Sequence, residues 1–206
     1  FIPFFNRVKD ELIDLEKISI PKPNEDGPIT NEIANQLNDL KRIYPIFQSW
    51  KKKLNVIDYG DMVLLAFDLL SQNEEALAAV QNHFRHIIID EFQDNNFALN
   101  EIVTLVTGKR KFITVVGDDD QVIYSFRGAN SYNISTFHNT YANHPKYKSI
   151  TLEKNYRSSQ TILDLANQSI SKNVDRIEKK LISNINNKGI KPIRFWGEKP
   201  EQLDFI

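Results

Sequence analysis

Carboxylate side chains follow directly after two short apolar runs of this sequence. The first run, His86–Ile89, leads into Asp90 and Glu91, and the second, Phe112–Val116, leads through a glycine into Asp118–Gln121. Runs rich in β-branched residues predict strands, and unbroken apolar runs are typical of strands covered on both faces in a parallel sheet. Ligands of open α/β sheets bind beyond the carboxyl ends of the strands. We therefore expect both acidic segments to lie at one functional edge.

Asp90 and Glu91 are the residues best suited to chemistry. One carboxylate can hold Mg²⁺, a hard cation that favours oxygen ligands, while its neighbour orients or deprotonates an attacking water. An adjacent Asp and Glu are more often an ordinary surface dipeptide. Here the pair follows three isoleucines, and a second acidic strand end lies nearby in the sequence. We therefore favour the functional interpretation.

Three segments together resemble the motifs of a known enzyme family. Asp90–Asp94, with the sequence DEFQD, is similar to motif II (Walker B) of the UvrD/Rep/PcrA group of superfamily 1 helicases. Val116–Ala129 resembles motif III of that group, and Leu152–Ser159 resembles motif IV. The three occur in the family's order and at plausible spacing, so the combination is far more specific than any one motif. A weaker resemblance extends over nearly the whole chain.

The resemblance implies an ATP site with Mg²⁺ as its metal ion. Asp90 and Glu91 would form the metal site, with Asp90 binding the ion through water and Glu91 activating the hydrolytic water. Gln121 would sense the γ-phosphate and relay its presence toward DNA. Tyr156 would stack on adenine, and Arg157 would stabilise the charge of the γ-phosphate as an arginine finger does.

Three further residues of the motif III segment are expected to contact DNA, namely Tyr124, Phe126 and Arg127. Bases stack on aromatic faces, and a guanidinium contacts phosphate or stacks as well. Many members of the family carry tryptophan where this chain has Phe126, which offers a smaller π-face. Packing in the core is the alternative for these aromatic residues. The resemblance implies single-stranded DNA or a duplex/single-strand junction as the partner, with movement in the 3′→5′ direction.

The resemblance also implies the fold class, which is α/β with a RecA-like (P-loop NTPase-type) parallel sheet, flanking helices and a helical N-terminal piece. Residues 1–45 would be the C-terminal part of a helical insertion, 46–144 the remainder of the first motor domain, and 145–206 the start of the second. A helical hairpin that packs its own core is the alternative for residues 1–45. Independently, the order strand, helix, strand over 86–116 predicts a βαβ unit.

Capping residues and apolar spacing locate the helices around these motifs. The expected N-cap residues are Asp58, Asn73, one residue of Asp94–Asn96, and Ser158 or Ser159. The helix after Asp58 is expected to bury one apolar stripe, which consists of Met62, Leu65, Ala66, Leu69 and Leu70. The run Lys51–Lys53 is expected to be a solvated face.

Composition excludes several classes of protein. The chain has 206 residues, 41% of them hydrophobic, which is enough for a core. Its net charge of -1 means that a DNA site would be a local groove and not a wholly basic surface. There is no cysteine, which excludes disulfides and thiolate metal sites. With no signal peptide and no apolar stretch long enough for a bilayer, we expect a cytoplasmic protein without membrane contact.

A phosphate-binding loop is missing from this sequence. That loop needs two glycines five positions apart, followed by Lys-Ser/Thr, and no two of the seven glycines have this spacing. The chain also begins with Phe1 and not with methionine. We therefore expect a middle section of a helicase, containing half of an ATP site. The alternatives are the motor portion of a helicase-nuclease and a non-catalytic adaptor that kept the fold, which the complete reading frame would distinguish.

We predict that this chain by itself has no measurable ATPase activity, even with DNA present. Without the amides and lysine of a phosphate loop, the β- and γ-phosphates have no cradle. Steady-state phosphate release is the measurement, with an intact helicase of the family as the positive control. Turnover near the roughly 1–100 s⁻¹ of protein kinases would contradict the prediction.

Overall fold

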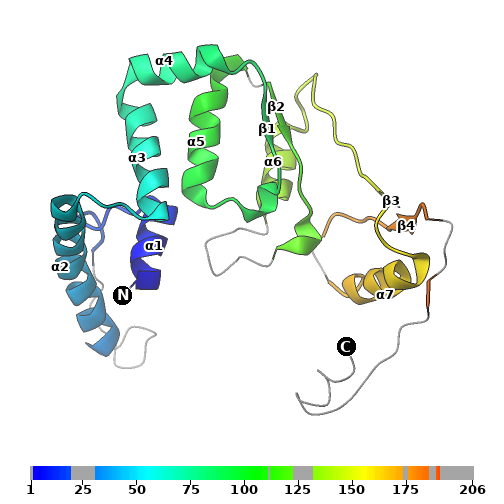
Figure 1. The fold of residues 1–206 in the computed structure, drawn as a ribbon, viewed down its shortest axis with the longest axis horizontal. Coiled ribbons are helices and arrows are strands. Elements are labelled where there is room, and N and C mark those ends of the chain that lie inside the picture. The colour runs from blue at the N-terminus through cyan, green and yellow to red at the C-terminus, as the bar shows by residue number, and fades with distance from the viewer. Residues whose placement is uncertain are drawn as a thin grey trace. The chain divides into compact units, whose positions relative to one another are not determined.

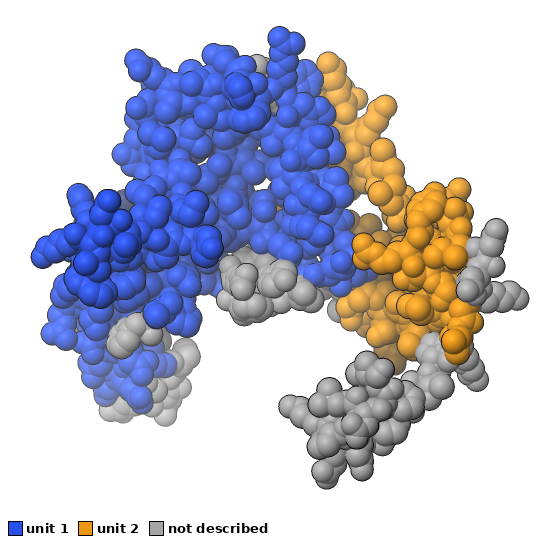
Figure 2. Space-filling model, viewed as in Figure 1, with its two compact units in different colours: residues 1–134 blue, residues 135–206 orange. Residues whose placement is uncertain are grey.

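The computed structural model describes residues 2–19, 31–110, 112–122, 132–173, 176–185 and 189–190. In these residues the chain is a helix-rich α/β structure with two small parallel sheets (Figure 1). The chain divides into two compact units, which comprise residues 1–134 and 135–206 (Figure 2). Within the described ranges, no helix combines the length and the apolar character needed to cross a membrane.

The first unit contains the strand pair that the sequence predicts. β1 (Ile87–Ile89) and β2 (Ile113–Val115) run parallel, and α5 (Phe97–Thr107) lies between them in the sequence. The predicted order strand, helix, strand is therefore confirmed. The expectation that both faces are covered is wrong for the described residues, because Ile88 is 70% exposed. Adjacent strand residues point to opposite faces, and the described elements cover only the face of Ile87 and Ile89.

Helix contacts supply most of the core of the first unit. α3 (Tyr59–Gln72) packs against α1 (Ile2–Asp10), α4 (Glu74–His83) and α5, and α1 also packs against α5. Figure 1 shows α4 running across the ends of α3 and α5. The ring of Phe5 on α1 lies 5.2 Å from the rings of Tyr44 and Phe47 on α2 (Asn31–Leu54). The buried apolar side chains of this unit are Phe5, Val8, Leu15, Ala34, Leu70, Phe92 and Ala98.

Side-chain caps begin three helices as the sequence predicts. The Asp58 carboxylate accepts the N–H of Asp61 at 2.9 Å, and the Asp61 carboxylate accepts the N–H of Asp58 at 3.0 Å. This reciprocal capping box starts α3 by satisfying two backbone donors that have no partner within the helix. Asn73 and Asn96 start α4 and α5, each accepting the backbone N–H three residues later at 2.9 Å.

The buried stripe predicted for α3 is mostly wrong. Leu70 is buried, but Met62, Leu65 and Leu69 are each more than half exposed. Apolar residues occupy nearly every position around this helix, so apolar spacing alone does not identify the packed face. Asp61 on the same helix is buried as well, although its polar character would assign it to solvent.

The second unit is built around a short strand pair and one helix. β3 (Lys154–Asn155) runs parallel to β4 (Ile182–Ser183), and α7 (Gln160–Ile170) packs against β4 through its buried Leu163 side. Ser159 occupies the N-cap position of α7, as predicted. Its hydroxyl lies 3.3 Å from the hydroxyl of Thr161 and caps no backbone N–H. α6 (Asn133–Tyr141) begins in the first unit and ends in the second.

Four charged side chains from α1, α2 and the start of α3 form a partly buried cluster. Lys9 Nζ lies 2.7 Å from Asp58 Oδ2 and 2.8 Å from Asp61 Oδ1. Lys51 Nζ lies 2.8 Å from Asp58 Oδ2 and also donates to Asp61 Oδ2. The expected solvated face is therefore wrong for Lys51, which is buried because the two carboxylates bind its ammonium group inside the unit. We call these four residues the charge cluster.

Opposing effects set the protonation of the charge cluster. Burial raises the pKa of Asp61, but the ammonium groups of Lys51 and Lys9 outweigh it and hold that pKa well below its ordinary 3.8. The pKa of Asp58 is lowered by the same balance. Burial acts to lower the pKa of Lys51, whereas its bonds to Asp58 and Asp61 raise it above the ordinary 10.5. These three groups therefore stay charged at neutral pH.

We predict that Lys9→Met destabilises the first unit strongly. The substitution keeps an aliphatic stem but leaves two carboxylates facing one ammonium group, and breaking a buried pair in this way costs about 3–5 kcal/mol. Denaturant unfolding followed by circular dichroism measures the change. Lys17→Met is the matched control, because Lys17 pairs with Asp14 at the exposed surface and its loss should change the midpoint little.

The pH dependence of unfolding provides a second readout for the same variant. The folded state lowers the pKa of Asp58 and of Asp61. Their contribution to the free energy of unfolding is therefore complete above pH 3.8 and is lost as the pH falls further. The folded state raises the pKa of Lys51, so its contribution to the free energy of unfolding is complete below pH 10.5 and is lost as the pH rises further. Lys9→Met should therefore lose less stability than the unmodified chain as the pH falls below 3.8. If Lys9→Met changes neither the unfolding midpoint nor the loss of stability at acid pH, a stabilising role of Lys9 is contradicted.

Candidate functional site

The first acidic segment turns sharply at the carboxyl end of β1. Asp90 and Glu91 are both exposed, and Asp90 Oδ1 accepts the N–H of Glu91 at 3.0 Å. Glu91 has φ 51° and ψ 40°, the left-handed conformation that residues other than glycine rarely adopt. The chain then enters the short 3₁₀ turn η1 (Phe92–Asp94). This bend lets Glu91 project from the sheet edge while the next side chains turn inward.

Gln93 connects the two acidic segments through its side-chain amide. The residue is only 1% exposed. Its Nε2 donates to Glu91 Oε2 at 2.7 Å, and its Oε1 accepts the backbone N–H of Asp118 at 3.0 Å. Gln93 belongs to the motif II segment, but the sequence alone predicts no role for it. A glutamine between two motif residues carries no local signal that would reveal these contacts.

Gly117 allows the two strand ends to approach this closely. A Cβ atom at this position would lie 2.6 Å from Gln93 Oε1 and 3.3 Å from the backbone N of Phe92. The first of these distances is shorter than real contacts allow, so any larger residue would displace the Gln93 amide. The Phe92 N–H donates to the carbonyl of Val116 at 2.9 Å, which extends the strand pairing up to the site.

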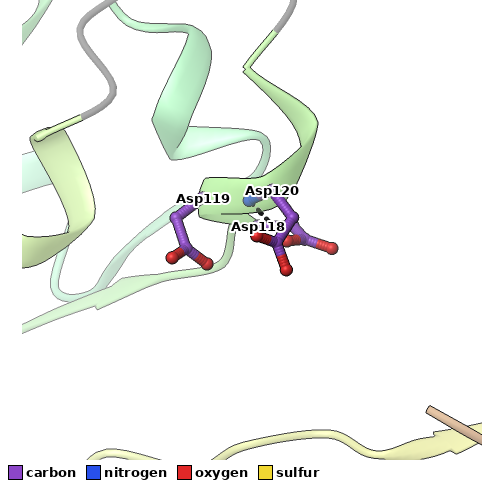
Figure 3. A group of neighbouring side chains, drawn as sticks. All are labelled: Asp118, Asp119 and Asp120. Atoms are coloured by element: carbon purple, nitrogen blue, oxygen red, sulfur yellow. Dashed lines mark hydrogen bonds between the residues drawn. The ribbon is translucent and has the colours of Figure 1, made fainter. Parts of the chain in front are cut away.

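The second acidic segment forms the 3₁₀ turn η3 (Asp119–Gln121). Asp118 caps this turn, because its Oδ1 accepts the N–H of Asp120 at 3.0 Å. The other oxygen, Oδ2, accepts the side-chain amide of Gln121 at 2.7 Å. Figure 3 shows the carboxylates of Asp118, Asp119 and Asp120 emerging around this turn, and their oxygens approach to within 4.8 Å of one another. Their oxygens are of the type that hard cations favour.

A continuous line of hydrogen bonds therefore runs across the sheet edge. It begins at the Glu91 carboxylate, passes through the Gln93 amide and Asp118, and ends at the Gln121 amide. Both ends of this line, Glu91 and Gln121, are predicted from the sequence to belong to one site, and the hydrogen bonds connect them. The two carboxylates in this line, those of Glu91 and Asp118, each accept a hydrogen bond from a neutral glutamine amide.

Asn133 stabilises the η1 turn through hydrogen bonds from its side chain. Its buried amide Nδ2 donates to the carbonyl of Asn95 at 2.7 Å and lies 3.4 Å from the carbonyl of Phe92. Its Oδ1 accepts from the side chain of Asn100 on α5 at 3.1 Å. No local sequence pattern identifies this residue, because the carbonyl groups that it binds are about 40 positions earlier in the chain.

The two motif IV residues lie in the second unit. Tyr156 is 71% exposed, and Arg157 is exposed as well. The Asn155 side-chain oxygen accepts the backbone N–H groups of Arg157 at 2.9 Å and Ser158 at 2.7 Å. This turn fixes the backbone that carries both side chains. The three residues predicted to contact DNA lie outside the described residues, namely Tyr124, Phe126 and Arg127.

Comparison with known proteins identifies the family. Residues 2–142 match the family described as the UvrD/REP helicase N-terminal domain. The chain belongs to this helicase family. The matched residues include the two segments that resemble motifs II and III.

Curated relatives give the same assignment. The chain is 43% identical over 142 residues to the ATP-dependent DNA helicase Rep of Escherichia coli, covering 69% of this chain and 21% of that protein. It is 37% identical over 158 residues to Rep of Buchnera aphidicola subsp. Baizongia pistaciae, covering 76% and 23%. It is 41% identical over 139 residues to the ATP-dependent DNA helicase PcrA of Leuconostoc citreum, covering 68% and 18%. The chain thus spans about a fifth of these relatives' length.

We predict that Asn133→Ala loosens the η1 turn. The substitution leaves buried carbonyl groups without their donor, which costs about 1–3 kcal/mol for each group left unsatisfied. Chemical unfolding measures the stability. Amide hydrogen exchange at Asp94 and Asn95, whose N–H groups close the turn, should become faster. Asn38→Ala is the control, because Asn38 is exposed and donates to the carbonyl of Ala34 within its own helix. Unchanged exchange at both amides would refute the role of Asn133.

Proposed function

We propose that this chain is part of an ATP-dependent DNA helicase or translocase that couples ATP hydrolysis to 3′→5′ movement on single-stranded DNA. The hydrogen-bond line from Glu91 to Gln121 carries this proposal. It joins a candidate general base to a candidate γ-phosphate contact at the edge where α/β sheets bind ligands. The names of the relatives, which are ATP-dependent DNA helicases, support the same activity.

In this proposal the chain is a section of a RecA-like motor. Residues 46–144 are the remainder of the first motor domain, 1–45 belong to a helical insertion, and 145–206 begin the second motor domain. The parallel pairing of β1 with β2 supports the RecA-like assignment, because that fold is built on a parallel sheet. The site on this chain is then half of an ATP site.

Asp90 and Glu91 are the residues that would hold Mg²⁺. Asp90 is exposed at the end of β1, and its bond to the N–H of Glu91 fixes the direction of its carboxylate. Carboxylate oxygens at a strand end fit a cation that prefers oxygen ligands. When bound with ATP, the ion supplies positive charge that neutralises the β- and γ-phosphate oxygens.

The remaining nucleotide contacts follow from side-chain chemistry. Glu91 takes a proton from the attacking water, and Gln121 offers an amide N–H to the γ-phosphate. Arg157 stabilises the negative charge that develops in the transition state, since its planar fork matches phosphate oxygens. Tyr156 has an exposed ring on which adenine can stack.

DNA contacts are assigned to the segment that follows Gln121. Tyr124 and Phe126 would stack on bases, and Arg127 would bind phosphate. The substrate is single-stranded DNA or a duplex/single-strand junction. Because Phe126 lies only five residues after Gln121, one short segment would contact both the nucleotide and the DNA, which allows the two sites to influence each other.

Glu91→Gln in the full-length helicase that carries this chain tests the proposal. The substitution keeps the shape of the side chain and removes the base, so hydrolysis should fall by about 10²–10⁴-fold. Nucleotide binding should be retained, because Asp90 remains available for the metal ion. DNA-stimulated phosphate release and binding of a fluorescent ATP analogue are the measurements.

Glu75→Gln provides the matched control for this experiment. Glu75 is an exposed glutamate in the first turn of α4, remote in sequence from the motifs. This variant should hydrolyse ATP at the rate of the unmodified helicase. Parental hydrolysis by Glu91→Gln would remove Glu91 from the catalytic role, and a full-length protein without DNA-stimulated ATPase would defeat the proposed function itself.

A further inference from the structure

The orientation of the Gln93 amide is determined by its partners. The backbone N–H of Asp118 is only a donor, so the atom that faces it must be Oε1. Nε2 then faces the Glu91 carboxylate, which is only an acceptor when ionised. Rotating the amide by half a turn would bring two donors together and two acceptors together. The buried side chain therefore has one satisfied arrangement.

Gln93 also has little room to leave this arrangement. The side chain is 1% exposed, and the Gly117 Cα passes so close that an added Cβ would lie 2.6 Å from Gln93 Oε1. The same Cβ would lie 3.0 Å from Ile134 Cδ1. A buried amide with both hydrogen bonds made in such a confined space makes this region rigid.

We propose that Gln93 is a positioning residue, whose amide holds the Glu91 carboxylate in place and ties it to the turn that carries Gln121. This inference rests on the proposed function, in which Glu91 is the general base. The bond from Gln93 engages Glu91 Oε2, which leaves Oε1 as the oxygen that receives the proton of the attacking water. A misplaced carboxylate would still permit nucleotide binding but would be badly aligned with the water.

The same amide links the general base to the γ-phosphate contact. Asp118 receives Gln93 on its backbone N–H and holds Gln121 on its carboxylate. A shift of η3 when Gln121 binds phosphate would therefore move the amide, and with it the Glu91 carboxylate. In this arrangement the base reaches its working position when the γ-phosphate is in place.

Two substitutions of Gln93 separate its two contacts. Gln93→Met has a similar length and loses both hydrogen bonds. Gln93→Glu keeps an oxygen for the Asp118 N–H but cannot donate to Glu91 when ionised. Gln81→Met is the matched control, because Gln81 also uses its amide inside the first unit, donating to the carbonyl of Leu105 at 2.7 Å.

The first measurement is single-turnover ATP hydrolysis by the full-length helicase, normalised to nucleotide-bound protein. We expect Gln93→Met and Gln93→Glu each to lower the rate by about 10- to 100-fold, as a misplaced catalytic group does. Affinity for a fluorescent ATP analogue should stay within about twofold, since no nucleotide contact is removed. Gln81→Met should hydrolyse at the parental rate. A purely structural amide would affect Gln93→Met and Gln81→Met alike.

The second measurement is amide hydrogen exchange at Asp118, which reports the other end of the bridge without requiring activity. Exchange should become faster in Gln93→Met and stay slow in Gln93→Glu. Should Gln93→Met fold poorly, the slow exchange and reduced turnover of Gln93→Glu decide the question by themselves.

Specific outcomes overturn the inference. If the parental helicase is active and Glu91→Gln is inactive, but both Gln93 variants hydrolyse within twofold of the parental rate, then Gln93 does not position the base. Parental turnover by Gln93→Glu alone would show that the Asp118 contact matters and the Glu91 contact does not. If instead the parental protein lacks ATPase activity, or Glu91→Gln retains it, the proposed function fails and not merely the role of Gln93.

Discussion

The pairing of two lysines with two aspartates is the constraint on which the first unit depends. Buried charges are costly unless each has an opposite charge and hydrogen bonds, and the charge cluster meets this condition only when α1, α2 and α3 are assembled together. Asp58 and Asp61 also cap the start of α3. The same two carboxylates thus satisfy a helix terminus and two ammonium groups. Since α3 packs against α5, and α5 connects β1 to β2, this junction supports the strand pair at the site.

Neutral amide side chains perform the corresponding task nearer the site. Asn96 caps α5 with its oxygen, while its Nδ2 donates to Asp10 Oδ1 on α1 at 2.8 Å. Burial raises the pKa of this Asp10 carboxyl, and so does the neighbouring Glu11. Gln93 and Asn133 likewise use both ends of an amide to join segments that are distant in sequence. Amides have fixed donor and acceptor directions, so they specify geometry without adding charge.

Local chemistry explains which features the sequence could predict. Two β-branched runs with an intervening helix predicted the parallel pair. Asp58, Asn73 and the segment Asp94–Asn96 predicted helix starts, because each signal lies within a few residues of what it determines. The sequence did not identify the packed face of α3, whose apolar residues surround the helix. Nor did it distinguish Lys51 from its solvated neighbours, because the partners of Lys51 are set by how three helices assemble.

The candidate site also contains residues that the sequence selects and residues that it does not. Asp90, Glu91 and Gln121 carry motif signals in a short stretch of sequence, so their types and order were sufficient to select them. Gln93 and Asn133 act through contacts with residues 25 to 41 positions away. Such contacts follow from tertiary packing alone. The periodic spacing of apolar residues does not reveal a buried amide that bridges two strand ends.

In the proposed function, the left-handed backbone of Glu91 places stability and activity in opposition at one residue. A side chain with a Cβ in this conformation costs roughly 1–2 kcal/mol relative to the right-handed helical region, and glycine would avoid that cost. Glycine, however, has no carboxylate. Substitution by glycine would therefore remove the backbone cost together with the proposed general base. Stabilised versions of this protein should therefore be engineered elsewhere in the chain.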